Sequence, residues 1–416
     1  MNPQDTNQGA IRNSPLSAAV PEHRIPLYDE AFAADPHGAY RRMRDEYESL
    51  VPVELWPGVP ATLVIKFSTA VRILNDPANF SADPRAWQAT VPRDIPIMPM
   101  IEYRPNALRT TGKGHIRYRD AVNDALAGMD LNVMRTSVER SAIPIINSFC
   151  TDGHADVLHQ YIFPMVFSVL CEFLGCPPEI GAEVARANAA MFDGVDTDKV
   201  NTIMTNALLD LTALKRSQPG DDITTRLVQH PARLTDDEMV HQLVLLFAAG
   251  VEPPMNLIAN TLLLMLTDPR FTGEGNSMPL STKMAIDERL ATDPPMANYC
   301  ITYPRQSVPI DGVLLPAQQP VIISMAACNT DPTINTGDFL GNGWNLAFSA
   351  GEHACPAHAR PYGVLLAQDV IDQLFDVLPE LKLGVAQDDL VWRPGPFHRA
   401  LSALPVVFPR TAPLSL

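Results

Sequence analysis

The sequence predicts a mainly α-helical protein with small β-sheets, folded as a single domain. Helical periodicity dominates after residue 25, and 46% of the 416 residues are hydrophobic, enough for a large core. No Pro/Gly/Ser-rich linker divides the chain. Strand-like runs are few, at Pro60 to Ile65, Val321 to Ser324 and Leu404 to Phe408. We therefore expect residues 1–25 to be a flexible leader and residues 26–416 to be one domain.

Composition excludes several classes of partner. The net charge of −16 argues against nucleic acid and against an anionic membrane surface. No run of eighteen uncharged apolar residues is present, so we expect no membrane-spanning helix. The polar N-terminus lacks a signal-peptide pattern, which favours a cytoplasmic location.

The cysteines are most simply interpreted as reduced thiols. None forms a C-x-x-C pair, and their spacing indicates neither a disulfide framework nor a zinc site. They are Cys150, Cys171, Cys176, Cys300, Cys328 and Cys355.

A long helix is predicted from Leu234 to Leu266. Thr235 and Glu238 form the pattern of a capping box, and the run Leu243 to Ala249 is apolar all round, which is typical of a buried helix. Polar residues then recur every four positions and so share one face: Glu252, Asn256 and Asn260. A polar stripe on a buried helix indicates either a satisfied network or a cavity.

Two prolines follow Glu252 inside this helix. Each removes one helix N–H, at a cost of roughly 3 kcal/mol. Pro253 and Pro254 have no N–H to donate to the carbonyls of Ala249 and Gly250. These carbonyls must therefore accept a hydrogen bond from water, a ligand or a side chain. We expect a kink or a widened groove at this point.

The segment Phe348 to Ala357 contains a single cysteine, Cys355, in a glycine-bearing turn. An apolar helix-like run follows it, from Pro361 to Leu378. A loop of this kind can offer a thiolate to a metal and hold the sulfur with backbone N–H groups. The alternative is a buried, inert thiol, the commonest fate of a free cysteine.

Three segments together resemble the cytochrome P450 family. The cysteine loop resembles the haem-ligand loop F-x-x-G-x-H-x-C-x-G, with Ala357 in place of the last glycine. The stretch Ala249 to Pro254 resembles A-G-x-[DE]-T-T with both threonines replaced, and His115 to Arg119 matches H-x-x-x-R. The resemblance spans most of residues 26–410 and includes segments 293–298, 327–332 and 391–400.

The resemblance implies a P450-like haem domain that binds haem b, with Cys355 as the axial thiolate ligand of the iron. Such a thiolate favours O–O cleavage. Carboxylate groups such as the haem propionates are held well by clustered cations, and the matching positions are His115, Arg119 and His353. An ordinary solvated helix face is the alternative for the first two. Further cofactor contacts are expected at Phe348, Ala249 and Gly250.

Glu252 falls on the acidic position of the resembled helix motif and is our candidate catalytic residue. It could relay protons during oxygen activation if its pKa suits that task. The alternative is a buried acid in a hydrogen-bonded network without a chemical role. The absent threonines leave water or a substrate group to complete the relay.

The chain departs from the family at the motif E-x-x-R. Glu288 matches the glutamate, but Ala291 stands at the arginine. Arg289 is no geometric substitute, because two residues turn about 200° around a helix. Residues 306–359 contain neither Lys nor Arg, so the usual Glu–Arg–Arg network cannot form. Apolar packing can replace such a network, and a branch of actinobacterial P450s that the chain resembles lacks this arginine.

The long, proline-rich stretch Asp83 to Asn106 corresponds to the loop that covers the substrate in P450s, and long irregular loops are usually functional. The alternative for each candidate is a place in the core or at the rim. The apolar content favours a small aromatic or hydrophobic substrate. The candidate substrate-binding residues are Trp87, Gln88, Met98 and Phe397, with Ile95 and Met100 as further possibilities.

Electrons must come from another protein, since no dinucleotide-binding G-x-G-x-x-G follows a strand. A ferredoxin is the usual donor in the family. A basic patch of Lys113, Arg117 and Arg360 could receive it, and simple solvation is the alternative for these residues.

The leading hypothesis is a haem-thiolate oxidase or monooxygenase that tailors a natural product, by hydroxylation or by oxidative coupling, for example of indole-bearing cyclic dipeptides. The second is a P450-like haem protein that acts as an accessory or regulatory partner without turnover of its own. The missing arginine and threonines motivate the second hypothesis. A helical binding protein without haem would require every match to be accidental.

Overall fold

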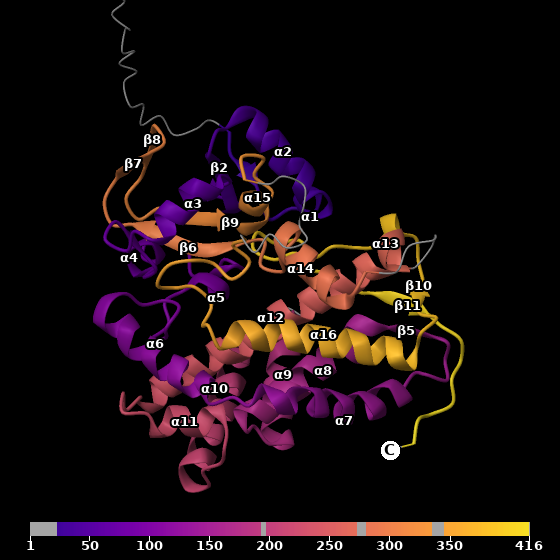
Figure 1. Ribbon diagram of the computed structural model, residues 1–416. Helices are drawn as coiled ribbons and strands as arrows, with labels where there is room; N and C mark the ends of the chain where they lie inside the picture. Colours follow the sequence, from indigo (N-terminus) through magenta and orange to yellow (C-terminus); the bar gives the residue numbers. More distant parts are fainter. Residues whose placement is uncertain (1–22, 193–196, 273–279, 335–344, 416) are drawn as a thin grey trace, which may run out of the picture.

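The computed structural model describes residues 23–192, 197–272, 280–334 and 345–415. Its larger layer is helical, and a mixed sheet forms the opposite side of the molecule (Figure 1). The predicted fold class, mainly helical with small sheets, is confirmed. The leader predicted for residues 1–25 lies largely outside the described residues, although Ile25 already belongs to β1 and pairs with Val53.

The helices vary from one turn to 32 residues. They are α1 (Glu30–Ala34), α2 (Pro36–Glu46), α3 (Phe67–Leu74), α4 (Arg85–Gln88), α5 (Met98–Ile101), α6 (Gly112–Ala127), α7 (Met134–Asn147), α8 (Phe163–Leu174), α9 (Pro178–Phe192), α10 (Thr197–Ser217), α11 (Ile223–Gln229), α12 (Asp236–Thr267), α13 (Pro269–Thr272), α14 (Thr282–Thr292), α15 (Met325–Asn329) and α16 (Ala359–Val377). Short turns of other helix types are η1 (Leu131–Val133), η2 (Leu158–Ile162) and η3 (Gln387–Asp389).

The strands form a six-stranded sheet in the order β1-β2-β3-β9-β6-β4, a three-stranded sheet β10-β11-β5 and the hairpin β7-β8. They are β1 (Ile25–Pro26), β2 (Leu50–Trp56), β3 (Val59–Val64), β4 (Phe80–Ser81), β5 (His154–Asp156), β6 (Asn298–Pro304), β7 (Val308–Ile310), β8 (Val313–Leu315), β9 (Val321–Ser324), β10 (Lys382–Leu383) and β11 (Pro405–Val407). The three predicted strands correspond to β3, β9 and β11.

The helix α12 crosses the middle of the molecule beside α16 (Figure 1). It begins at the predicted capping box, where Thr235 and Glu238 each bond to the other's backbone. By length and composition α12 could cross a membrane, yet it is the central helix of the core and most of its residues are buried. It stays helical through Pro253 and Pro254. The kink expected there stays a prediction.

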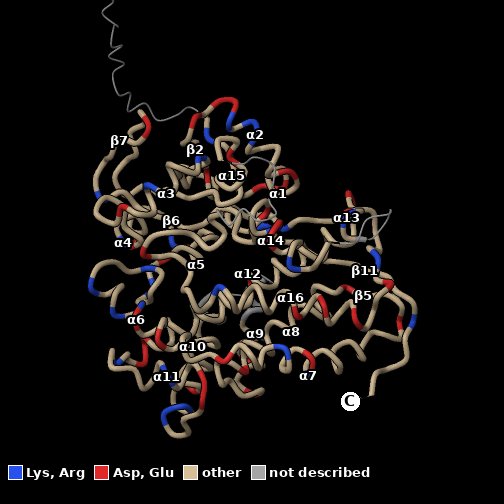
Figure 2. The backbone as a smooth tube through the Cα atoms, viewed as in Figure 1, with Lys and Arg blue, Asp and Glu red and all other residues tan. Residues whose placement is uncertain are grey.

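Two hydrophobic clusters account for most of the interior. The larger lies among α6 to α12 and α16, and the smaller joins the main sheet to α2 and to the segment 87–101. Charged residues lie along the outer helices and loops, and much of the backbone between the sheet and α12 is uncharged (Figure 2). The segment Asp83 to Asn106, in which no regular element could be predicted, contains the one-turn helices α4 and α5.

Candidate active site

The cysteine loop is a tight turn that ends just before α16. The Cys355 N–H donates to the carbonyl of Phe348 over 2.9 Å and so closes the loop. Gly351 has φ of +73°, and a Cβ there would lie 2.0 Å from the carbonyl oxygen of Leu74. Both the backbone conformation and the close approach therefore require glycine at this position. Ala357 is exposed and has no positive φ, so an alanine is tolerated where the resembled motif has glycine.

Two guanidinium groups lie beside the loop. Arg360 Nε donates to the Cys355 carbonyl over 3.1 Å, and Arg119 donates to the carbonyl of Ala354. Burial raises the pKa of the Cys355 thiol, and the charges of Arg360 and Arg119 act in the opposite direction. Coordination to a metal deprotonates a thiol outright. The two neighbouring cations would then stabilise the negative charge of the Cys355 thiolate.

The two predicted histidines meet. The rings of His115 on α6 and His353 in the loop have their centroids 4.0 Å apart. His115 Nδ1 lies 2.9 Å from the carbonyl oxygen of Ala107. Neither ring nitrogen of His353 makes a hydrogen bond, although Nε2 lies 3.4 Å from the Glu352 carboxylate. Burial and, to a smaller extent, the neighbouring His115 lower the pKa of His353 to about 3, so this ring is neutral.

A further buried cation near these histidines was not predicted. Arg109 is 3% exposed, and its charge contributes to the lowered pKa of His353. Its guanidinium donates to the Tyr299 hydroxyl over 2.6 Å and to the Met100 carbonyl. An arginine before a helix is usually solvated, so only the packing of the loop 102–111 against β6 could reveal this position.

These residues fit a haem. Ala248 and Ala249 are exposed although their neighbours Phe247 and Val251 in the core helix are buried, which indicates open space beside α12. Neither buried nitrogen of His353 makes a well-formed hydrogen bond, and the charges of Arg119 and Arg109 act on this ring. A flat apolar group carrying carboxylates matches both features. The residues that would hold it are Cys355 for the iron, and His115, Arg119, His353 and Arg109 for the carboxylates.

Glu252 is engaged in an ion pair. Its Oε1 accepts hydrogen bonds from Arg393 Nη2 and, over 3.1 Å, from Asn256 Nδ2. The nearby His398 has its pKa lowered to about 4 by burial and by the charge of Arg393, while Glu252 acts in the opposite direction. The polar stripe of α12 is thus a partly satisfied network that reaches the C-terminal segment. A catalytic role for Glu252 stays a prediction.

Gly250 lies against α8. A Cβ at Gly250 would lie 2.9 Å from the side chain of Leu170, so the glycine permits close packing of α12 against α8. Its contribution to a cofactor site would be through the backbone. Phe348 is partly buried, with the guanidinium of Arg360 5.9 Å from its ring centroid.

Three of the four candidate substrate residues lie in one cluster. Trp87, Met98 and Phe397 are all buried in the smaller hydrophobic cluster, together with Ile95. Gln88 instead accepts the backbone N–H of Tyr103 over 2.9 Å, and Met100 is 37% exposed. The structure brings these residues together, and whether they contact a substrate stays a prediction.

Only part of the predicted basic patch is free to contact an electron donor. Arg117 pairs with Glu238, the capping residue of α12, over 2.6 Å. It therefore fastens α6 to the start of α12. Lys113 is exposed, and Arg360 lies at the base of the cysteine loop.

A different arginine pairs with Glu288 in place of the arginine that the resembled motif has. Glu288 is 6% exposed, and its Oε1 pairs with Arg270 Nη2 of α13 over 2.8 Å. Arg289 approaches the same carboxylate only to 3.9 Å, in agreement with the expected helix geometry. Replacing the arginine by Ala291 thus did not leave Glu288 without a cation.

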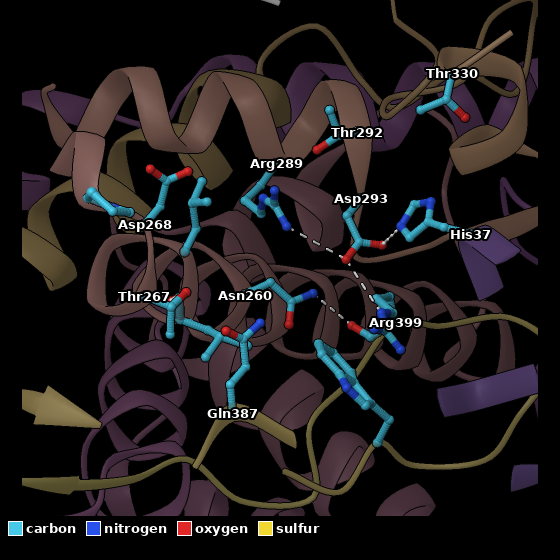
Figure 3. A pocket seen from close by; sticks show the side chains of 14 residues that line it. His37, Asn260, Thr267, Asp268, Arg289, Thr292, Asp293, Thr330, Gln387 and Arg399 are labelled. Carbon is cyan, nitrogen blue, oxygen red and sulfur yellow. Dashed lines mark hydrogen bonds and ion pairs between the residues drawn. The ribbon is translucent and has the colours of Figure 1, made fainter. Parts of the chain in front are cut away.

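A separate cavity of about 650 Å³ lies between α12, α14 and the C-terminal segment (Figure 3). At its centre Asp293 interacts with His37 at 3.2 Å, Arg399 at 3.4 Å and Arg289 at 3.8 Å. Burial alone would raise the pKa of Asp293, but these partners outweigh it and lower the pKa. The lining contains none of the residues predicted for haem or substrate, so this cavity is distinct from the candidate active site.

Known proteins support the resemblance along the whole chain. No family model matches. Vitamin D(3) 25-hydroxylase of Pseudonocardia autotrophica is 29% identical over 403 residues, covering 93% of this chain and 97% of the relative. Cytochrome P450 monooxygenase PikC of Streptomyces venezuelae is 27% identical, covering 94% and 95%. The solved structure of CYP154C4 from Streptomyces sp. W2061 aligns with a TM-score of 0.81 at 24% identity, covering 92% and 97%.

The chain is similar to cytochromes P450 over more than nine-tenths of its length and has their fold. In cytochromes P450 the haem iron has a thiolate ligand, and the loop around Cys355 has a cysteine at the matching position. The family resemblance inferred from the cysteine loop and the helix motifs is therefore confirmed.

Proposed function

We propose that this P450 is a cytoplasmic haem-thiolate monooxygenase that tailors a small aromatic or hydrophobic natural product. The observation that carries the proposal is the convergence of Cys355, His115, His353 and Arg119 at one place. Full-length relatives named as a hydroxylase and a monooxygenase support the reaction type. Haem, when bound, would supply the oxygen chemistry, and the protein positions and insulates it.

The residues of this chain would then divide the work. Arg360 and the closed loop hold the sulfur in place, and the cationic group around His353 binds carboxylates of the cofactor. Asn256 and Arg393 donate hydrogen bonds to the Glu252 carboxylate and orient it beside the path of the proton. Because Pro253 replaces the threonine of the resembled motif, water or a hydroxyl or N–H of the substrate completes the path.

The accessory role without turnover is not favoured. It was motivated by the missing arginine network and by the two missing helix threonines, and Arg270 supplies the cation that Glu288 needs. The cysteine loop keeps its closing hydrogen bond, and the histidine pair is formed. A ferredoxin is the electron donor we propose, docking where Lys113 and Arg360 lie.

The first experiment is the absorption spectrum of the reduced protein with and without carbon monoxide. We expect the band of a thiolate-ligated ferrous carbonyl in the wild type and in Cys150→Ser, whose buried thiol lies outside the site. Cys355→Ser should lose this band while the fold is retained by circular dichroism. A Cys355→Ser spectrum identical to the wild type would overturn the assignment of the axial ligand.

The second experiment tests the substrate class. Aromatic and aliphatic metabolites are titrated into the ferric protein, and the shift of the haem absorption reports displacement of the distal ligand. We expect binding of aromatic or hydrophobic molecules, weakened by Met98→Ala and unchanged by Val391→Ala, an exposed apolar control. Binding confined to highly charged molecules would contradict the proposed substrate class.

A further inference from the structure

The helix α8 ends in a Schellman motif that contains two cysteines. Gly175 adopts φ of +63°, the Cys176 N–H donates to the Cys171 carbonyl over 2.8 Å, and the Gly175 N–H donates to the Glu172 carbonyl over 3.0 Å. This pair of bonds defines the motif, which commonly places the side chains of its first and sixth residues in contact. That contact is usually apolar. In this protein both positions carry thiols.

The two sulfur atoms share one small space between α8 and α9. A Cβ added to Gly181 would lie 3.4 Å from Cys171 Sγ and 3.9 Å from Cys176 Sγ. Cys171 is partly exposed to solvent, whereas Cys176 is 8% exposed. A small reagent can therefore enter beside Cys171, and both thiols are within its reach.

A buried ion pair covers the turn. Lys215 Nζ lies 2.7 Å from Asp222 Oδ2, and a Cβ on Gly175 would lie 2.5 Å from the same ammonium group. The Cys171 thiol and Lys215 lower the pKa of Cys176, against the effect of burial. The Cys176 thiol and burial raise the pKa of Cys171. A cation beside two neighbouring thiols favours loss of a proton from the pair, as in redox-active dithiols.

We propose that Cys171 and Cys176 are an oxidisable dithiol, which hydrogen peroxide converts into a disulfide joining the end of α8 to the segment before α9. The Cys176 thiolate attacks one peroxide oxygen; an S–O bond forms, the O–O bond breaks, and the departing hydroxide takes a proton. The Cys171 sulfur, losing its proton, then attacks the sulfenic sulfur; the S–S bond forms and water leaves. Two thiols and one peroxide give one disulfide and two waters.

The test is a thiol map of the haem-loaded protein. Reduced protein is treated with increasing hydrogen peroxide, remaining thiols are blocked with N-ethylmaleimide, and the chain is cut after glutamate. Cleavage after Glu172 places Cys171 and Cys176 on different peptides. The peptide that ends at Glu172 also contains Cys150. We expect the two peptides to stay linked, two hydrogen atoms lighter than their sum with Cys150 alkylated, and to separate on reduction.

Matched serine variants decide the chemistry. Cys171→Ser should abolish the linked peptides and leave a Cys176 sulfenic acid that dimedone traps. Cys176→Ser should abolish both products, and Cys150→Ser should change neither. The proposal fails if both cysteines of the wild type remain open to N-ethylmaleimide after the peroxide is consumed. It fails equally if the dimedone adduct of Cys171→Ser lies on another cysteine.

Discussion

Arg393 of the C-terminal segment forms an ion pair with Glu252 in the middle of α12. The pair joins the acidic position of the resembled oxygen-binding motif to a residue 141 positions later in the chain. About a quarter of each side chain is exposed, so water can reach the carboxylate while the cation orients it. The C-terminal segment therefore sets where the acid points. The motif alone did not indicate that Arg393 orients the Glu252 carboxylate.

The effects of Glu252→Gln and Arg393→Gln on the free energy of unfolding should not be additive. A double-mutant cycle of urea unfolding should give a coupling free energy of about 1 kcal/mol, because the pair is partly shielded from solvent. The exposed pair Arg135 and Glu139 serves as control and should give about 0.3 kcal/mol. Equal coupling in the two cycles would show that Arg393 does not hold Glu252.

Gly351→Ala should disrupt the cysteine loop. The added Cβ would collide with the Leu74 carbonyl, and the positive φ would be strained besides. We expect a large loss of bound haem, measured as the ratio of haem to protein absorbance. Gly363→Ala in α16 is the matched control, since a Cβ there meets nothing within 4 Å. It should retain haem and stabilise the helix by up to about 1 kcal/mol. Full haem content in both variants would contradict the geometry of the turn.

Arg270→Met should destabilise the protein by about 1 to 3 kcal/mol, because it leaves the buried Glu288 carboxylate without its main cation. The second variant, Arg270→Met with Glu288→Gln, removes the buried charge and should regain most of the loss. Both are measured by urea unfolding at neutral pH. Destabilisation that persists unchanged in the double variant would mean that packing of Arg270, and not the charge of Glu288, is responsible.

The sequence predicted those features that depend only on neighbouring residues. The capping box at Thr235, the strand at Val321 to Ser324 and the cysteine loop all follow from neighbouring residues, and the structure contains them. The strands β2 and β6 were not predicted, because their pairing with β3 and β9 depends on distant segments. The roles of Arg109, Arg270 and Arg393 were missed for the same reason. Arg109 and Arg393 have partners more than a hundred positions away, and Arg270 on α13 reaches Glu288 on the next helix, α14.

His398 should make the protein less stable in mild acid. In the folded protein burial and Arg393 lower the pKa of His398 to about 4, whereas an unfolded histidine has a pKa of about 6.5. Below pH 6.5 the unfolded chain binds a proton that the folded chain does not, so stability falls as the pH drops from about 6.5 to about 4 and levels off below. Between pH 7 and pH 5 this one group should remove about 2 kcal/mol.

The measurement is the free energy of unfolding of the wild type and of His398→Gln at pH 7 and pH 5. The variant should lose less stability than the wild type over this interval, by about 2 kcal/mol. His154→Gln, which changes an exposed histidine, should follow the wild type. If His398→Gln also follows the wild type, then His398 is protonated equally in the folded and unfolded states. In that case the buried, cationic environment assigned to it beside Arg393 would be wrong.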